Sequence, residues 1–223
     1  MMLLITDTSG KNGSVALARV ETDDKIVVLE SVPLAGGTFS AQLVPQIAGL
    51  LEKHGLRKTE IDAFIVVSGP GSFTGLRVGL SAIKALAEVL KKPILPVSLL
   101  EVIATMSDVR GKVIAALDAG RGEIYTGTYS LAGGTQLESE QLLTGAEFAD
   151  LVRGNIVASR DAGLAKAANE SGAAEVRSVI PDASGIAKSG WSKLRAGFSV
   201  TPEELEANYI RRSDAEIFSK SSS

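Results

Sequence analysis

The sequence contains no cysteine and only one histidine, His54, among its 223 residues. Without cysteine, the chain can form neither a disulfide nor a thiolate metal site. A single histidine cannot supply the histidine pair of a zinc peptidase, which excludes that class of enzyme. No nucleophile elbow surrounds His54, and its position just before Gly55 predicts a structural role at the end of a helix.

Long apolar runs are also missing from the sequence. No stretch approaches the roughly 20 residues that a membrane-spanning helix needs, and the start of the chain carries no basic leader. The net charge of -3 argues against strong nucleic-acid binding by this chain alone. Because 45% of the residues are apolar, the chain can build a substantial core. We therefore expect a soluble cytoplasmic protein of one large or two small domains.

One pattern of the sequence occurs twice. An apolar strand ends in an aspartate, a turn of small residues follows, and a second strand returns, first over residues 3–20 and again over residues 113–131. Helices and strands then alternate in both halves. The repeat predicts an α/β fold of two related lobes with mixed sheets, comprising residues 1–108 and residues 109–223.

Two amphipathic helices are predicted in the first lobe, over residues 40–54 and residues 75–91. Apolar side chains recur along the first of them at spacings of three or four, which marks a single buried face. Ser40 is expected to cap the start of this helix, and Gly55 is expected to end it.

The segment SGPGSFTGLRVG, residues 68–79, lies between a predicted strand and the second helix. This position suits a phosphate loop, but the segment lacks the lysine of a Walker A motif, and its glycine spacing is one residue too long for a Rossmann turn. Gly75 and Gly79 form a smooth strip that would allow a second helix to approach closely. Turn geometry and packing therefore compete with ligand binding as explanations. Arg77 opposes the helix dipole and is expected to pair with an acid.

Asp7 and Asp118 end the first strand of their respective halves. Two acids that face a cleft are suited to holding a metal-bound nucleotide or to acting as a base. An aspartate at a strand end also starts a turn through its own side chain. Both explanations stay open, although the equivalent positions of the two residues in the repeat favour a shared role.

Four motifs, LLITDTS, SGPGSFTGLRVG, LDAGRGEIY and YIRRSDAE, follow one another along the chain. In these motifs the chain resembles the TsaB (YeaZ) family, a subunit of the bacterial machinery that makes N6-threonylcarbamoyladenosine in tRNA. The resemblance implies an actin, Hsp70 and sugar-kinase type (ribonuclease H-like) fold and a non-catalytic role. It also implies binding to a catalytic paralogue, TsaD, through the first-lobe helices, and a homodimer when the paralogue is absent. A TsaE-like ATPase, and tRNA through the complex, are the further expected partners.

The resemblance also assigns residues of this chain. The expected partner seam consists of Leu43, Ile47, Gly75, Leu76, Arg77, Gly79, Leu80 and Ile83. No cofactor is expected for the chain alone, but ATP or ADP at the boundary with the paralogue would lie near Asp7, Thr8, Gly71, Ser72 and Asp118.

Some positions depart from the family pattern. The stretch SRDA, residues 159–162, replaces a GDGA-like turn and lacks both glycines, which weighs against nucleotide binding by the chain alone. Phe39 stands where relatives often carry a histidine, and no proline precedes Tyr209. The alternative function is a small-molecule phosphotransferase of the same fold that uses Asp7 and Asp118.

Overall fold

In the computed structural model of this chain, residues 1–210 are described. They belong to two compact units. Unit 1 comprises Met1–Val102 and Pro181–Ala207, and unit 2 comprises Ile103–Ile180 together with the described residues from Asn208 onward. The predicted motif YIRRSDAE begins at Tyr209 and lies mostly outside the described residues.

Unit 1 contains a five-stranded mixed sheet in the order β3-β2-β1-β4-β5. Its strands are β1 (Met2–Asp7), β2 (Asn12–Val20), β3 (Ile26–Ala35), β4 (Ala63–Gly69) and β5 (Ile94–Ser98). β1 pairs antiparallel with β2 and parallel with β4. All seven residues of the central strand β4 are buried, as expected of a strand that is covered on both faces.

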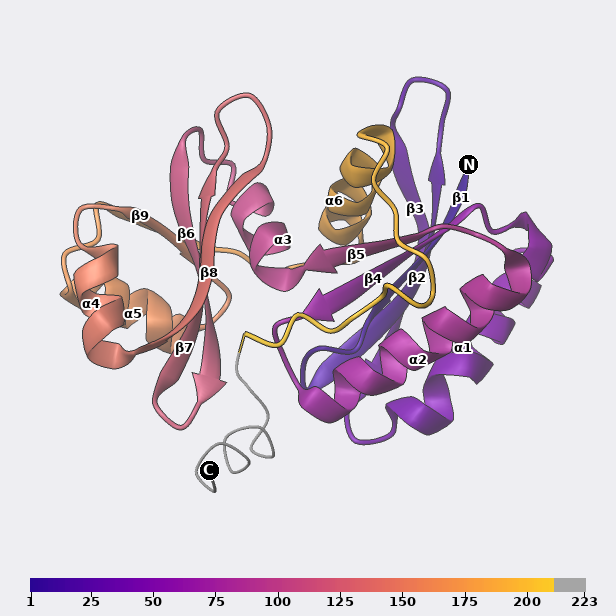
Figure 1. The fold of residues 1–223 in the computed structure, drawn as a ribbon, viewed down its shortest axis with the longest axis horizontal. Coiled ribbons are helices and arrows are strands. Elements are labelled where there is room, and N and C mark those ends of the chain that lie inside the picture. The colour runs from indigo at the N-terminus through magenta and orange to yellow at the C-terminus, as the bar shows by residue number, and fades with distance from the viewer. Residues whose placement is uncertain (211–223) are drawn as a thin grey trace. The chain divides into compact units, whose positions relative to one another are not determined.

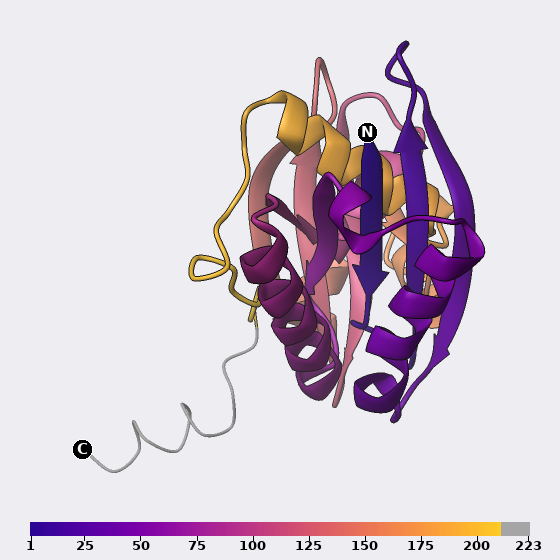
Figure 2. The same ribbon diagram turned by 90° about the vertical axis from the view of Figure 1, so that its right-hand side faces the viewer.

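Helices cover both faces of this sheet. α1 (Phe39–Lys53) and α2 (Phe73–Leu90) contact each other on one face, with the short 3-10 helix η1 (Lys58–Glu60) between them in sequence, and α6 (Ala183–Arg195) packs on the opposite face (Figure 1). Figure 2 shows α1 and α2 running side by side along the sheet. α3 (Leu99–Met106) follows β5.

Unit 2 repeats the arrangement of strands with a five-stranded sheet in the order β10-β9-β6-β7-β8. Its elements are β6 (Lys112–Gly120), β7 (Glu123–Ser130), β8 (Gln136–Thr144), α4 (Gly145–Val152), β9 (Ile156–Ser159), α5 (Ala162–Glu170) and β10 (Glu175–Ser178). β6 pairs antiparallel with β7 and parallel with β9, as β1 does with β2 and β4. The predicted fold of two related α/β lobes with mixed sheets is therefore confirmed.

The units divide the chain differently from the expected boundary near residue 108. Pro181–Ala207, which the sequence placed in the second lobe, belongs to unit 1. The reason is that α6 contacts all five strands of the unit 1 sheet, so its apolar face is buried there. No helix within residues 1–210 combines the length and apolar character that a bilayer crossing requires.

The predicted end of α1 is correct, whereas its predicted start is not. Thr38, rather than Ser40, occupies the cap position. Gly55 has a φ of +64°, and its N–H donates to the Glu52 carbonyl at 3.0 Å while the Leu56 N–H donates to the Leu51 carbonyl at 2.9 Å. These two bonds form a Schellman motif, which glycine favours because it adopts the left-handed conformation without strain.

His54 has the structural role that its position predicted. Its Nε2 lies 3.0 Å from Oε2 of Glu30, and Lys53 Nζ lies 2.7 Å from Oε1 of the same carboxylate. These contacts tie the end of α1 to the edge strand β3. The hydrogen bonds from Lys53 and His54 lower the pKa of Glu30 below its usual value.

This contact predicts how stability depends on pH. Because the folded pKa of Glu30 is lowered, its stabilising contribution is complete above the unfolded pKa of about 4.3 and is lost as pH falls through the folded pKa. Glu30→Gln should therefore lower the melting temperature at neutral pH and reduce the loss of stability on acidification. Thermal melts across the acidic range measure this. Glu52→Gln is the control, because Glu52 forms no ion pair within residues 1–210. The prediction would be contradicted if the melting temperatures of wild type and Glu30→Gln fell equally steeply as the pH is lowered.

α6 approaches the sheet more closely than a side chain at its contact point would permit. Gly190 is buried, and a methyl group built on it would lie 2.6 Å from both Cδ1 and Cγ2 of Ile65 on β4. Glycine at this position therefore sets the distance between α6 and the sheet.

Gly190→Ala should destabilise unit 1 by about 1–3 kcal/mol, because the added methyl overpacks the contact with Ile65. Gly49→Ala is the matched control, since Gly49 lies in α1 and nothing stands within 4 Å of its added methyl. The control should stabilise by about 0.5–1 kcal/mol through helix propensity. Urea unfolding measures both, and the prediction fails if the two changes have the same sign.

Candidate partner-binding surface

The glycine-rich segment connects β4 to α2. The Ser72 hydroxyl caps the helix by accepting the Gly75 N–H at 3.3 Å. The Ser72 N–H donates to the carbonyl of Ser9, in the β1–β2 turn, at 2.7 Å. Ser72 therefore caps the start of α2 and also holds it against the β1–β2 turn of the same unit.

The glycines of the segment face this β1–β2 turn. Methyl groups built on Gly71 and Gly75 would lie 2.3 Å from the Ser9 carbonyl oxygen and 2.1 Å from the Thr8 carbonyl oxygen. A methyl group on Gly79 would lie 2.3 Å from Oγ1 of Thr8. The strip was expected to receive a partner helix, and this expectation is corrected: it receives the turn of its own unit, which leaves no space for another chain there.

The apolar residues assigned to the partner seam also lie inside unit 1. All five have an exposed fraction of 5% or less and belong to one core cluster, namely Leu43, Ile47, Leu76, Leu80 and Ile83. The helical spacing that identified them is the spacing of the face that packs on the sheet. The seam assignment for these five side chains is therefore wrong for the folded chain.

The outward face of α1 is the unusual one. Exposed helix faces are normally charged or polar, yet α1 has no charged residue from Phe39 to Leu51. Val44 is 54% exposed, and Ala48 and the other outward small residues are exposed as well. Their exposure, together with this lack of charge, gives α1 a surface suited to close contact with another protein.

The outward face of α2 continues this surface. Phe73 is 39% exposed, and the guanidinium carbon of Arg77 lies 3.6 Å from the centroid of its ring. Ala85 is exposed farther along the helix, and Val89 is 71% exposed. We call the outward residues Val44, Ala48, Phe73, Arg77, Ala85 and Val89 the α1–α2 face. Of the predicted seam, only Arg77 belongs to it.

Asp7 and Asp118 both start turns through their side chains. Asp7 Oδ1 accepts hydrogen bonds from the Ser9 N–H at 2.8 Å and the Ser9 hydroxyl at 2.6 Å. Asp118 Oδ1 accepts the Gly120 N–H at 2.8 Å. Asp7 belongs to unit 1 and Asp118 to unit 2, and their shared role at a nucleotide stays a prediction.

The remaining nucleotide-proximal residues lie along the β1–β2 turn and the glycine segment. Thr8 is 1% exposed, and its hydroxyl has no hydrogen-bond partner among the described residues. Gly71 and Ser72 contact the turn as described above. No group of three metal-binding side chains gathers within residues 1–210. A nucleotide near these residues stays a prediction.

The sequence patterns did not single out the outward residues of α1 or Asp161. The outward residues of α1 carried a signal, the lack of charge between Phe39 and Leu51, whereas the seam prediction used the apolar stripe. Asp161 carried none: its carboxylate accepts the backbone N–H of Asp118 at 2.9 Å, a contact between segments 43 residues apart.

Both the sequence and the fold of this chain are similar to those of known proteins. A family model described as TsaD, tRNA N6-adenosine threonylcarbamoyltransferase, matches residues 33–162, which is more than half of the chain. The fold is similar to that of YeaZ from Pseudomonas aeruginosa, with a TM-score of 0.74 and 26% sequence identity over 94% of this chain and 100% of that one.

Two curated proteins show the same similarity in sequence. The chain is 33% identical over 135 residues to the tRNA threonylcarbamoyladenosine biosynthesis protein TsaB of Bacillus subtilis, covering 60% of this chain and 57% of that protein. It is 32% identical over 132 residues to TsaB of Escherichia coli, covering 58% and 55%. The chain thus spans little more than half the length of these relatives. It belongs to the family that the TsaD model describes, and within that family to the TsaB, or YeaZ, proteins.

Proposed function

We propose that this chain is a non-catalytic subunit of the machinery that forms N6-threonylcarbamoyladenosine in tRNA. In this role it binds and supports a TsaD-like catalytic paralogue. The observation that carries the proposal is the α1–α2 face, a partly apolar surface in which Arg77 is the one charged member, on a chain similar to the TsaB proteins. The names of the similar TsaB proteins support the pathway.

The chemistry of the α1–α2 face supports a helical partner. Small side chains along α1, such as Ala48, allow another helix to approach closely. Phe73 and Arg77 supply an aromatic ring and a guanidinium, which are enriched among the residues that dominate binding energy at interfaces. Val44 and Val89 add apolar area that association would remove from water.

The residue content of the chain supports a non-catalytic role. The resemblance to the TsaB family implies that the catalytic paralogue holds its metal through paired histidines, and this chain has only His54. The carboxylates of Asp7 and Asp118 are engaged in their own turns, so the alternative phosphotransferase reading gains no support from their contacts.

The proposal includes the rest of the assembly. The chain would pair with itself through the α1–α2 face when the paralogue is absent, because the same apolar surface would otherwise stay in water. A TsaE-like ATPase would join the complex, ATP or ADP would bind at the boundary with the paralogue, and tRNA would be reached through the complex.

The first test targets the face directly. Val44→Glu with Ala48→Glu should weaken binding to the TsaD-like partner by roughly tenfold or more, because binding would have to remove two carboxylates from water. Both sites are exposed in the isolated chain, so the melting temperature should stay unchanged. Co-purification and calorimetry measure binding, and mass photometry should show the homodimer weakened in parallel.

Leu137→Glu is the matched control, because Leu137 is 55% exposed on β8 of unit 2. It should leave assembly intact. Substitutions such as Leu80→Glu are unsuitable, since Leu80 is buried in the unit 1 core and its loss would confuse folding with binding. Normal assembly of the Val44, Ala48 double variant would refute the placement of the interface.

The second test concerns the pathway. Depletion of this protein in its host should reduce N6-threonylcarbamoyladenosine in total tRNA, because the catalytic partner would lack its support. Nucleoside mass spectrometry measures the modification. The wild-type chain and Leu137→Glu should restore it, whereas the Val44, Ala48 double variant should not. Normal modification after depletion would overturn the proposed function.

A further inference from the structure

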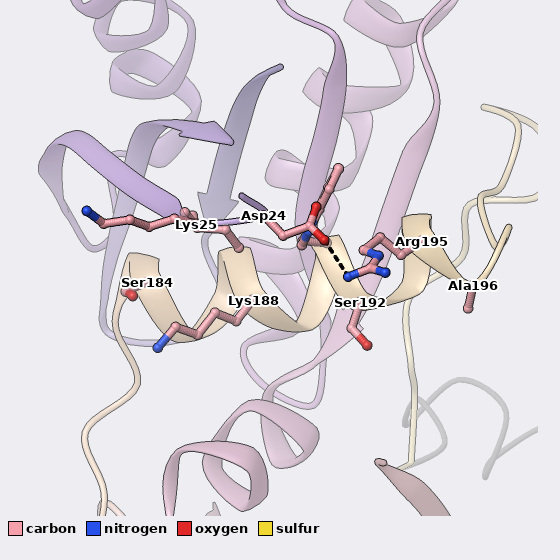
Figure 3. Close-up of a pocket in the computed structure, with 9 residues that line it drawn as sticks. Asp24, Lys25, Ser184, Lys188, Ser192, Arg195 and Ala196 are labelled. Atoms are coloured by element: carbon pink, nitrogen blue, oxygen red, sulfur yellow. Dashed lines mark hydrogen bonds and ion pairs between the residues drawn. The ribbon is translucent and has the colours of Figure 1, made fainter. Parts of the chain in front are cut away.

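A groove lies between α6 and the β2–β3 turn of unit 1, on the face of the sheet opposite to α1 and α2 (Figure 3). Its volume is about 680 Å³, within the range of about 300–1,000 Å³ that is typical of small-molecule sites. Neither the nucleotide prediction nor the α1–α2 face involves it, so it requires a separate explanation.

One side of the groove is a continuous line of side chains on α6. Ser184, Lys188, Trp191 and Arg195 are spaced by four, three and four residues, which places them along one face of the helix. This face therefore presents a hydroxyl, an ammonium, an indole and a guanidinium in sequence. Lys25, from the turn before β3, faces it from the other side.

The charges in the groove do not balance. Arg195 Nη1 lies 2.6 Å from Oδ2 of Asp24, so this pair is neutral as a unit. Lys25 and Lys188 form no ion pair with any described residue. Figure 3 shows Ser184 between these two lysines at one end of the groove, with the Asp24–Arg195 pair farther along α6. That end thus carries two uncompensated positive charges beside a hydroxyl.

We propose that this groove binds a phosphomonoester group on a small organic body. The phosphate would lie between Lys25 and Lys188 and accept the Ser184 hydroxyl, and the body would contact Trp191. A phosphomonoester carries a charge of about -1.5 to -2 at neutral pH and three acceptor oxygens, which matches two ammonium groups and one hydroxyl better than a carboxylate does.

A nucleic-acid backbone fits the groove less well than a small ligand. Glu21 and Asp23 lie on the same turn as Lys25, and these acids would repel an extended polyanion. A single phosphate meets less of this repulsion, because it occupies only the end of the groove between Lys25, Lys188 and Ser184 and does not run along the turn. The net charge of the chain, -3, points the same way.

The chain provides its own reporter for a test. Trp191 is the only tryptophan and lines the groove. Its indole N–H is buried without an acceptor among the described residues, so a ligand that contacts the ring can change its surroundings. Fluorescence of the isolated chain should respond to adenosine monophosphate, more weakly to inorganic phosphate, and not to adenosine.

Matched variants locate the response. Lys188→Met should weaken binding of adenosine monophosphate by roughly tenfold, because a hydrogen bond to a charged group is lost, and Lys25→Met should act similarly. Lys58→Met, which removes an exposed lysine of η1, should bind as wild type does. Calorimetry on the same proteins gives the affinity independently of fluorescence.

Several results would overturn the proposal. One is the lack of any response to adenosine monophosphate at millimolar concentration, and another is equal binding by wild type and the Lys25, Lys188 double variant. The phosphate role would be refuted if adenosine bound as tightly as adenosine monophosphate. If single-stranded RNA bound more tightly through the same lysines, the groove would be an RNA site and the small-ligand proposal would be wrong. The titration needs neither the paralogue nor tRNA modification, so its outcome is independent of the proposed function.

Discussion

The contact between the glycines of α2 and the turn at Thr8 and Ser9 is the constraint on which unit 1 depends. Gly71, Gly75 and Gly79 approach this turn so closely that an added methyl would lie within 2.3 Å of it in every case. At Gly71 and Gly75 the contact cannot be relieved by rotating a side chain, because the opposing atoms are backbone oxygens. The position of α2, and of α1 packed beside it, follows from this contact.

The same constraint determines which surface is available for binding. Because the inner side of α2 must be glycine where it meets the turn, and apolar where it meets the sheet, only its outward side can vary for recognition. α6 repeats the logic on the opposite face, where Gly190 meets Ile65. Both helix layers lie close to the sheet and bury their inner side chains there. The groove beside α6 and the α1–α2 face are formed by side chains that lie outside this core.

Much of this fold could be predicted from the sequence, because the spacing of apolar residues and the signals for turns and helix ends are local properties of the chain. The alternation of apolar residues, the aspartate turns of the repeat and the stop at Gly55 depend on neighbours along the chain. The strip at Gly75 and Gly79 was also recognised as a place of close approach. What a sequence pattern does not contain is the identity of the approaching group, so a partner helix was expected where Thr8 lies. The return of α6 to unit 1 was missed for the same reason.

The two units show how differently the same topology can close its first turn. In unit 1, the loop after β4 reaches the β1–β2 turn through a backbone hydrogen bond from Ser72 to Ser9 and through glycines that admit no side chain. In unit 2, the loop after β9 reaches the start of the β6–β7 turn through a carboxylate, that of Asp161, which accepts the Asp118 N–H. Asp161 holds the cap position of α5, yet its side chain makes no capping bond to that helix.

A side-chain bridge tolerates the loss of glycine in SRDA, whereas the backbone contact of unit 1 does not. The contacts of the glycine-rich segment in unit 1 therefore favour packing over ligand binding, the two explanations that the sequence had left open.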